Sequence, residues 1–313
     1  MNADALATEH AARLGRMDPL LPSSDPFAGR GNEAEILIAE DGESWASGVP
    51  FRSEVAADSS DSLWRALVEY RLIVRLAGPH PGRPLTEILT QWDEYLRRVA
   101  IPGEWDTAAV VPRPSRDTAG SAELLRQGFS ATRVLAVRPA DRLANPGPPA
   151  EPGVRIRPAE PGDLGTAVEL FTELQQYDSQ FGMVTLRANA GDLLTSDLES
   201  QLDRTDPTVW IAELYGRPLG LLRIQYPAEA SWVAPYVSAE RVGYLSTLHV
   251  AEAARSSGVG SALAAHAHQL FDEADVDAVL LHHALASPRS TPFWYSRGYR
   301  PLWTYWYRRP ATL

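Results

Sequence analysis

Hydrophobic and polar residues follow one another in the second half of the chain in runs that predict a regular succession of strands and helices. Alternating or apolar runs predict strands at 154–157, 209–214, 219–226, 242–250, 278–284 and 302–308. Apolar residues at helical spacing predict helices at about 163–174, 192–202, 260–274 and 292–297. The resulting order, β-α-α-β-β-β-α-β-α-β, is typical of a mixed α/β or α+β layered domain.

The end of the first half repeats part of this pattern. It comprises an apolar strand at 106–111, a Pro-Arg-Pro-Ser-Arg segment at 112–116 that should break the strand, a short helix at 121–126 and a strand at 131–137. The same order recurs at the end of the chain, and the glycine-aromatic steps at Gly128 and Gly298 lie 170 residues apart. We interpret this as an internal repeat of about half the chain and expect two tandem domains.

The boundary between the halves is marked by composition. Four prolines and two glycines fall between Asn145 and Gly153, which neither a helix interior nor a central strand tolerates. We therefore expect one domain at 1–140, a linker at 141–152 and a second domain at 153–313.

Composition narrows the chemistry. The chain of 313 residues is 44% hydrophobic and 22% charged, a soluble globular profile, without an apolar run that would cross a bilayer or a signal-peptide pattern. We expect a cytoplasmic protein that does not bind a membrane. The sequence contains neither cysteine nor lysine, which excludes disulfides, thiolate catalysis, Cys-zinc sites and Schiff-base chemistry, and we expect no metal.

The net charge of −11 bears on partners. A chain this acidic is a poor candidate for nucleic-acid binding through phosphate contacts. It suits a cationic or amine-bearing substrate, although most of the negative charge is expected to be solvated surface.

The most informative segment is 248–263, where a strand runs through a glycine-punctuated loop into an apolar helix. Loop N–H groups and the first helical turn would point at an anion, and the helix dipole favours negative charge there. Glycines allow the backbone to approach phosphate oxygens closely. The segment is neither a Rossmann fingerprint nor a P-loop, because the third glycine and the Gly-Lys-Ser/Thr ending are missing.

This segment resembles the phosphate loop of the GNAT acyltransferase superfamily, whose signature is Gln/Arg-x-x-Gly-x-Gly/Ala after the fourth strand. Here the signature is Arg255-Ser-Ser-Gly258-Val-Gly260, five residues beyond Val250. Downstream, Phe293-Trp-Tyr-Ser-Arg-Gly-Tyr299 resembles the family's Phe-Tyr-x-x-x-Gly-Phe, and the resemblance covers about 160 residues. It implies two tandem GNAT-like domains, each a mixed, mostly antiparallel splayed sheet flanked by helices.

The resemblance also implies the cosubstrate and its site. Acetyl-CoA or another acyl-CoA would lie between the fourth and fifth strands, its pyrophosphate on the amides of 256–261 and its pantetheine on the backbone of 248–250. The Val250 N–H would polarise the thioester carbonyl. The expected set is Leu248, His249, Val250, Arg255, Ser256, Ser257, Gly258, Val259, Gly260, Ser261, Ser290, Phe293 and Trp294.

The catalytic groups depart from the family pattern. The family's usual acid, a tyrosine four residues before the glycine, aligns with Trp294, and Tyr295 would point about 100° away on a helix. The fourth strand offers no carboxylate facing the cleft. The candidates for acid and base are Tyr244, Ser246, His249, His282, His283 and Tyr295. Because the two adjacent histidines point to opposite faces of a strand, only one of them is expected to see the cleft; alternatively each histidine only completes a hydrogen bond at a strand end.

The first half lacks the signature and has Ala-Gly-Pro-His-Pro-Gly at 77–82 where a phosphate loop would fall. Prolines remove N–H donors, so this half should bind pyrophosphate badly and serve to wall the acceptor cleft. The leading hypothesis is an N-acyltransferase acting on a primary amine of a small molecule, with an amino sugar or an antibiotic-type metabolite as a fitting acceptor. The alternatives are a non-catalytic acyl-CoA-binding protein and a protein N-acetyltransferase. We expect a monomer or a weak homodimer.

Overall fold

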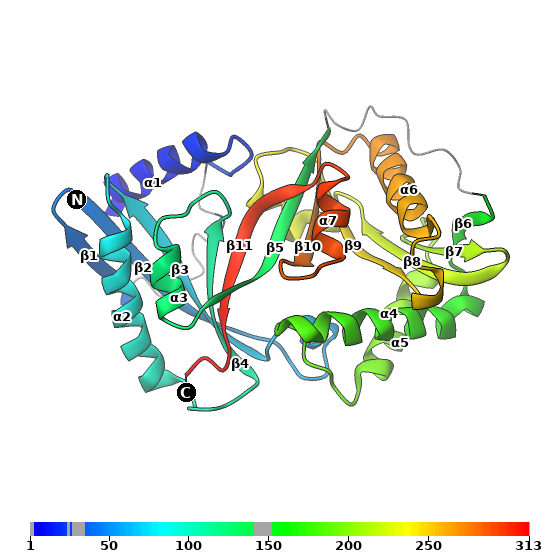
Figure 1. Cartoon of the computed structure of the whole chain (residues 1–313), viewed down its shortest axis with the longest axis horizontal. Helices are drawn as coiled ribbons and strands as arrows, with labels where there is room; N and C mark the ends of the chain where they lie inside the picture. Colours follow the sequence, from blue (N-terminus) through cyan, green and yellow to red (C-terminus); the bar gives the residue numbers. More distant parts are fainter. Residues whose placement is uncertain (1–2, 24–25, 27–34, 141–151, 313) are drawn as a thin grey trace.

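The computed structural model describes residues 3–23, 26, 35–140 and 152–312. Over these residues the strands form one sheet of 11 strands with helices on both faces (Figure 1). The strands are β1 (Leu37–Asp41), β2 (Ser44–Glu54), β3 (Val68–Ala77), β4 (Thr107–Pro114), β5 (Ser130–Pro139), β6 (Val154–Pro158), β7 (Val209–Leu214), β8 (Arg217–Gln225), β9 (Val242–Val250), β10 (Ala278–Ala284) and β11 (Arg300–Arg308). The α-helices are α1 (Ala3–Met17), α2 (Gly82–Val99), α3 (Ser121–Arg126), α4 (Leu164–Asp178), α5 (Ala190–Leu202), α6 (Val259–Glu273) and α7 (Ser290–Tyr295).

The strand order shows how the two halves are joined. It runs β1-β2-β3-β4-β11-β5-β10-β9-β8-β7-β6, so the last strand of each half lies within the other half. β11 pairs with β4 and β5, and β5 pairs with β11 and β10, all antiparallel. Figure 1 shows β5 and β11 side by side at the centre of the molecule. The domain boundaries expected from the sequence therefore divide the chain but not the sheet.

The predicted order of elements in the second half is confirmed, because its strands and helices have strong local periodicity. The repeat is visible as well: β4-α3-β5 corresponds to β10-α7-β11. Gly128 and Gly298 both adopt the left-handed backbone conformation, with φ of 79° and 86°, before the corresponding final strands. A residue with a side chain would be strained at either position.

The prediction that residues 112–116 break the fourth strand is wrong, because β4 continues to Pro114. β3 pairs with β4 only as far as Val110. The N–H of Ser115 points toward β11, away from β3, and donates to the carbonyl of Leu302. Because backbone N–H groups alternate between the two edges of a strand, the nitrogens of Pro112 and Pro114 face the edge where β3 no longer pairs. No N–H donor is needed there, so proline is tolerated.

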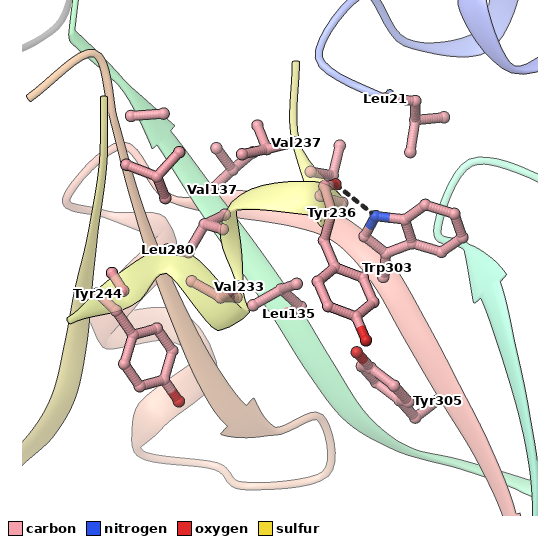
Figure 2. Close-up of a cluster of buried hydrophobic side chains, with 14 of the residues drawn as sticks. Leu21, Leu135, Val137, Val233, Tyr236, Val237, Tyr244, Leu280, Trp303 and Tyr305 are labelled. Carbon is pink, nitrogen blue, oxygen red and sulfur yellow. Dashed lines mark hydrogen bonds between the residues drawn. The ribbon is translucent and has the colours of Figure 1, made fainter. Parts of the chain in front are cut away.

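Four apolar clusters cover the sheet, two on each face. On one face α4 and α5 cover the second half, and α1 with the segment 230–237 covers the centre. On the other face α6 and α7 cover the second half, and α2 and α3 cover the first. The central cluster is aromatic (Figure 2): Trp303 is buried and its indole N–H donates to the carbonyl of Tyr236 at 2.8 Å.

The sheet opens at one place in each half. β9 and β10 pair in parallel only from Val242 to Tyr244, and no pairing joins 245–250 to the rest of β10. β3 and β4 likewise pair in parallel over four residues and then part. The gap between β9 and β10 connects the two faces of the sheet.

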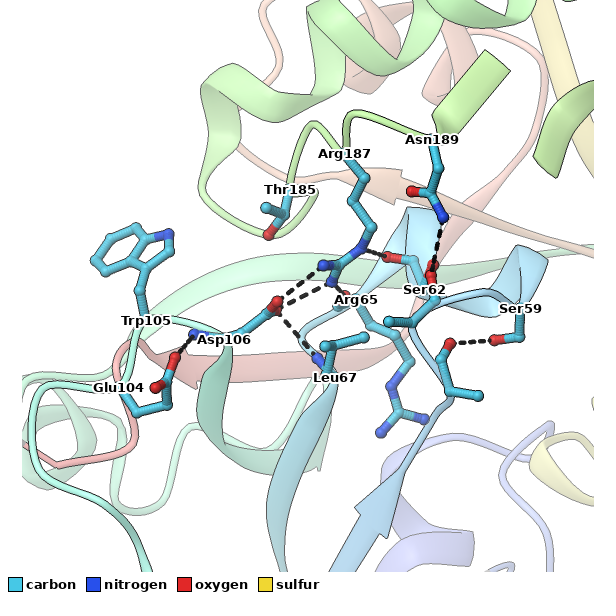
Figure 3. A network of polar contacts seen from close by, with 12 residues as sticks. Ser59, Ser62, Arg65, Leu67, Glu104, Trp105, Asp106, Thr185, Arg187 and Asn189 are labelled. Atoms are coloured by element: carbon cyan, nitrogen blue, oxygen red, sulfur yellow. Dashed lines mark hydrogen bonds and ion pairs between the residues drawn. The ribbon is translucent and has the colours of Figure 1, made fainter. Parts of the chain in front are cut away.

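A polar junction fastens the first half to the second (Figure 3). Arg187, in the loop before α5, donates to both carboxylate oxygens of Asp106 at 2.8 and 3.0 Å and to the carbonyl of Ser62 at 2.8 Å. These bonds hold the pKa of Asp106 below its usual value. The junction positions the segment Ser60–Trp64 against α4 and α5, where Leu63 is fully buried.

Within the described ranges, no helix combines the length and the apolar character that crossing a membrane would require.

Candidate active site

A cavity of about 1250 Å³ passes along the gap between β9 and β10. At one end, on the face that α6 and α7 cover, it reaches the loop before α6. At the other end, on the α4 face, it is lined by aromatic and charged side chains from both halves. The cavity is therefore wide enough for a ligand that reaches both faces of the sheet.

The loop at residues 255–261 has the geometry of an anion site. Ser256 and Gly258 adopt left-handed conformations with φ of 64° and 84°, and α6 begins at Val259. The first N–H groups of a helix have no acceptor within it, so those of 259–261 are free to meet a ligand. Arg255 adds a cation beside the loop, and its guanidinium also contacts Glu252 at 3.1 Å.

Helix α7 closes the same end of the cavity. A Cβ added to Gly260 would lie 3.4 Å from the ring of Phe293, so the loop and α7 are in close contact. Arg297 lies over that ring at 3.6 Å and donates to the hydroxyl of Ser261 at 2.6 Å. Ser290 lines the cavity at the start of α7. A second cation, Arg297, thus stands beside the loop.

β9 supplies an open backbone edge along the gap. A register shift against β8 leaves Ser246 as an extra residue between Leu245 and Thr247, which is a β-bulge. Leu248, His249 and Val250 follow the bulge, pair with β8 on one side and line the cavity. Backbone groups on the gap side of this segment have no strand partner in the described structure and are available to a ligand.

His282 and Tyr244 lie together on the α4 face. The Tyr244 hydroxyl is 2.9 Å from Nδ1 of His282, and Trp232 stacks on the imidazole. Burial holds the pKa of His282 well below its usual value, with Arg133 adding to the effect, so the ring is neutral. Either the tyrosine O–H or the ring N–H can be the donor of the hydrogen bond between Tyr244 and His282.

His283 lies on the opposite face. Its Nδ1 donates to the carbonyl of Ala284 at 3.1 Å, while Nε2 is buried and makes no hydrogen bond in the described structure. Burial lowers its pKa. Both histidines line the cavity, so the expectation that only one of them would do so is wrong: the cavity crosses the gap and meets both faces of β10.

The remaining predicted catalytic residues are placed differently. His249 is buried and bonds Glu173 on α4 at 3.0 Å; burial lowers its pKa although the carboxylate opposes this. Tyr295 does not line the cavity, and its ring meets His283 edge-on. Among the predicted cofactor residues, Ser257 and Val259 are not in the cavity lining: one hydroxyl bonds the carbonyl of Ala254, and the valine side chain is in the core.

Asp178 was missed by the sequence reasoning. It lies at the end of α4 and lines the cavity, and its carboxylate forms no hydrogen bond or ion pair with any other described residue. Burial raises its pKa to about 6, against an opposing influence from Arg133. A carboxylate that titrates near neutral pH and faces a cavity is suited to accept a proton. No motif surrounds it, so only its place in the fold identifies it.

Charged residues of the first half complete the α4 end. Glu69 is fully buried and accepts hydrogen bonds from Arg71 and from the hydroxyl of Tyr307, and it forms an ion pair with Arg65 at 2.9 Å. These cations hold the pKa of Glu69 below its usual value despite burial. Arg65, Arg71 and Tyr307 line the cavity, whereas Glu69 lies behind them. Two arginines share one carboxylate, so the cavity wall here carries net positive charge.

The corresponding loop of the first half is differently built. α2 begins after Pro81 and has Pro84 in its first turn, so two N–H groups are missing there. The N–H of Arg83 is taken by the carbonyl of His80. Few donors remain for a phosphate at this helix start.

In the described part of the chain, no group of three or more His, Asp and Glu side chains is arranged to hold a metal ion.

Comparison with known proteins gives a consistent picture of the fold. Residues 173–299 match the model of the acetyltransferase (GNAT) family. No curated protein sequence matches the chain. A GCN5-related N-acetyltransferase from Sphaerobacter thermophilus has a similar structure, with a TM-score of 0.54 and 18% identity over 87% of this chain and 82% of that one.

Two further solved structures are similar over nearly the full length. A GCN5-related N-acetyltransferase from Kribbella flavida has a TM-score of 0.45 and 13% identity, with 98% of this chain and 95% of that chain covered. A tandem GNAT protein from the clavulanic acid biosynthesis pathway has a TM-score of 0.48 and 13% identity, with 98% and 96% covered. In this chain itself, the strand-helix-strand unit β4-α3-β5 recurs as β10-α7-β11, which is the tandem arrangement expected from the sequence.

Proposed function

Because the C-terminal half of this chain belongs to the GNAT superfamily, we propose that the protein is an acyl-CoA-dependent N-acyltransferase. It transfers an acetyl or longer acyl group to the primary amine of a small molecule. The observation that carries the proposal is the single cavity that joins the loop at 255–261 to the charged, aromatic end through the gap between β9 and β10.

The loop binds the pyrophosphate of acyl-CoA through the free amides at 256–261 and the cations Arg255 and Arg297. The pantetheine lies along the open edge of β9, and a backbone N–H between Leu248 and Val250 donates to the thioester oxygen. This brings the thioester to the point where the cavity opens toward α4.

The reaction is direct attack of the amine on the thioester. The amine nitrogen forms a bond to the carbonyl carbon, the C–S bond breaks, and the nitrogen loses one proton. Asp178 takes that proton, because it is an unpartnered cavity carboxylate with a pKa of about 6. His282 is a poorer base, since burial holds its pKa well below its usual value.

No acid side chain is needed for the leaving group. Trp294 lines the cavity where the family pattern has tyrosine, and an indole does not protonate a thiolate. A thiol has a pKa of about 8.5, so a thiolate leaves readily near neutral pH and takes its proton from water.

Trp294 also favours a second candidate, a non-catalytic acyl-CoA-binding protein. Release of free thiol from acetyl-CoA in the presence of any amine contradicts it. A protein acceptor is less suitable, because the amine end of the cavity is walled by aromatic and arginine side chains of both halves.

The first experiment is calorimetric titration with acetyl-CoA and longer acyl-CoAs on the wild type, on Gly260→Glu and on the control Gly191→Glu. A side chain at Gly260 would contact Phe293, and the charge of a glutamate there would face the phosphates. Gly191 is an exposed residue of α5 with nothing within 4 Å of an added Cβ. We expect one site per chain, weakened by about 100-fold or more only in Gly260→Glu, since juxtaposed like charges cost several kcal/mol.

Wild type that binds no acyl-CoA would contradict the proposal. Two sites per chain would instead show that the loop of the first half still binds phosphate, against the sequence-based expectation. The ranking of chain lengths identifies the donor.

A further inference from the structure

The acceptor end of the cavity contains a cation that the acyl-transfer chemistry does not use. Building on the proposed function, we infer that the acceptor amine also bears a carboxylate and that Arg133 binds this carboxylate. The acceptor class is thus an amino acid or a similar amino carboxylate, and the product is its N-acyl derivative.

Arg133 lies on β5, the strand of the first half that is inserted between β10 and β11. In the sheet it is opposite Ala284 on one side and Tyr305 on the other. Its side chain is half-buried and lines the cavity, and none of the described carboxylates lies within ion-pair distance of it. A cation inside a protein cavity gains most from a charged partner at ion-pair distance, and none of the described residues supplies one to Arg133.

The neighbours of Arg133 are also hydrogen-bond donors. The hydroxyl of Tyr305 and the guanidinium of Arg71 line the same cavity. Figure 2 shows the ring of Tyr305 pointing toward that of Tyr236, so several hydroxyls are gathered at this end. A wall with many donors and a spare positive charge suits an anion with several acceptor atoms.

The acidic groups of the cavity are arranged to leave this charge uncompensated. Asp197 is paired with Arg223, and Glu69 is shared by Arg65 and Arg71 behind the wall. Asp61 is exposed, on the segment that precedes β3. Asp178 remains: it lines the cavity and its pKa is influenced by Arg133, but the described structure has no ion pair between them. An acceptor with an amine at Asp178 and a carboxylate at Arg133 would satisfy both groups at once.

The carboxylate remains unchanged in the reaction. The N–C bond forms at the amine, the C–S bond of the thioester breaks, and the proton passes to Asp178, so Arg133 acts only in binding and orientation. Holding the carboxylate fixes the amine relative to the thioester, which affects kcat as well as KM. The aromatic surroundings lower the local dielectric and strengthen the charge-assisted bonds.

The test compares matched acceptors. Free L-amino acids, their carboxamides and the corresponding decarboxylated amines are offered with the preferred acyl-CoA, and kcat/KM is measured for each. We expect the amino acids to be favoured over their carboxamides by about 10- to 100-fold, the usual contribution of hydrogen bonds to a charged group. Equal kcat/KM for the carboxylates and the carboxamides would overturn the inference.

Arg133→Met removes the charge and keeps much of the volume. Because Arg133 also influences the pKa of Asp178, the variant is measured at pH 8.5, well above that pKa of about 6. It should lower kcat/KM for amino acids to the value for carboxamides, cost the carboxamides much less, and leave acyl-CoA affinity unchanged. Arg155→Met, at a side chain that is 75% exposed on β6, is the control and should behave as wild type. Equal losses on both acceptor series would assign Arg133 a structural role and contradict the inference.

A binding measurement separates this inference from the proposed function. Wild type and Arg133→Met, each saturated with coenzyme A, are titrated calorimetrically with an amino acid and with its carboxamide. Carboxylate-selective binding that depends on Arg133 would support the site even without turnover. Absence of such selectivity would contradict the inference that Arg133 binds a carboxylate, even if amines are acylated. Failure to bind acyl-CoA would contradict only the proposed function.

Discussion

Asp178 is the residue on which the proposed proton transfer depends, and its surroundings set the pH range in which it works. Its carboxyl is the base only when ionised, so kcat/KM should rise with pH through about 6, the value to which burial raises the pKa. Asp178→Asn should remove this rise and lower kcat/KM by about 10²- to 10⁴-fold, as measured from pH 5 to 9.

Acyl-CoA affinity should be the same in Asp178→Asn and in wild type, since the residue lies away from the phosphate loop. The exposed Asp206→Asn serves as the control and should retain both the rate and the pH profile. A rate for Asp178→Asn within threefold of wild type would assign the base to another group.

The raised pKa of Asp178 also determines how the stability of the folded protein changes with pH. A carboxyl whose pKa is higher in the folded protein than in the unfolded chain favours folding at low pH, and this contribution is lost as pH rises through about 6. Asp178→Asn removes a buried charge above that pH. Its melting temperature at pH 8 should therefore be no lower than that of wild type, which also distinguishes loss of the base from loss of the fold.

The residues of the candidate site differ in how well the sequence alone predicts their role. The loop at 255–261 follows from local spacing, because a strand, two glycines and a helix are contiguous in the chain. Asp178 and Arg133 have no such signal, since they meet only when α4 is packed over the sheet and β5 enters the second half. The candidates predicted from the sequence all lie on β9, β10 or α7, and none lies on α4.

Among the elements, α6 shows how tightly a helix is held against the strand that carries the site. A Cβ added at Gly243 of β9 would lie 2.5 Å from the ring of Phe271, which is fully buried on α6. Gly243→Ala should therefore cost about 1–3 kcal/mol and lower the melting temperature by about 3–10 °C.

The matched control for this substitution is Gly165→Ala, at an exposed position on α4 where nothing lies within 4 Å. It should instead stabilise by about 0.5–1 kcal/mol, because alanine is the better helix former. Calorimetric melting of both variants decides the point; equal shifts of the same sign would mean that the β9–α6 contact is not tight.

The elements also show where local patterns fail. Alternation located the hairpin β7–β8 and the strands β9 and β10, because each has one or two buried faces. The prolines of β4 are tolerated only because β3 has already left that edge. This condition depends on a different strand and cannot be obtained from the segment itself.

The whole molecule is held together by exchange of the final strands. Neither half contains all the strands of its own part of the sheet, since β11 completes the first half and β5 completes the second. Residues 1–140 and 152–313 produced separately should each lack cooperative thermal unfolding. Mixed after co-expression, they should recover the unfolding transition and the acyl-CoA binding of the intact chain.

A protease site inserted in the predicted linker at 141–152 provides the control. Cleavage there in the folded protein should leave the two fragments associated, because the sheet and the ion pair between Arg187 and Asp106 still join them. A separate first half that unfolds cooperatively would show that strand exchange is dispensable for its fold.

The strand order also has a consequence during protein synthesis. β4 and β5 leave the ribosome early, yet the strand that lies between them, β11, is translated about 160 residues after β5 ends. At 5–20 residues per second, the first half waits roughly 10–30 s with a vacant slot in its sheet. During that interval its unpaired edges are open to other chains, which favours aggregation until β11 has been translated.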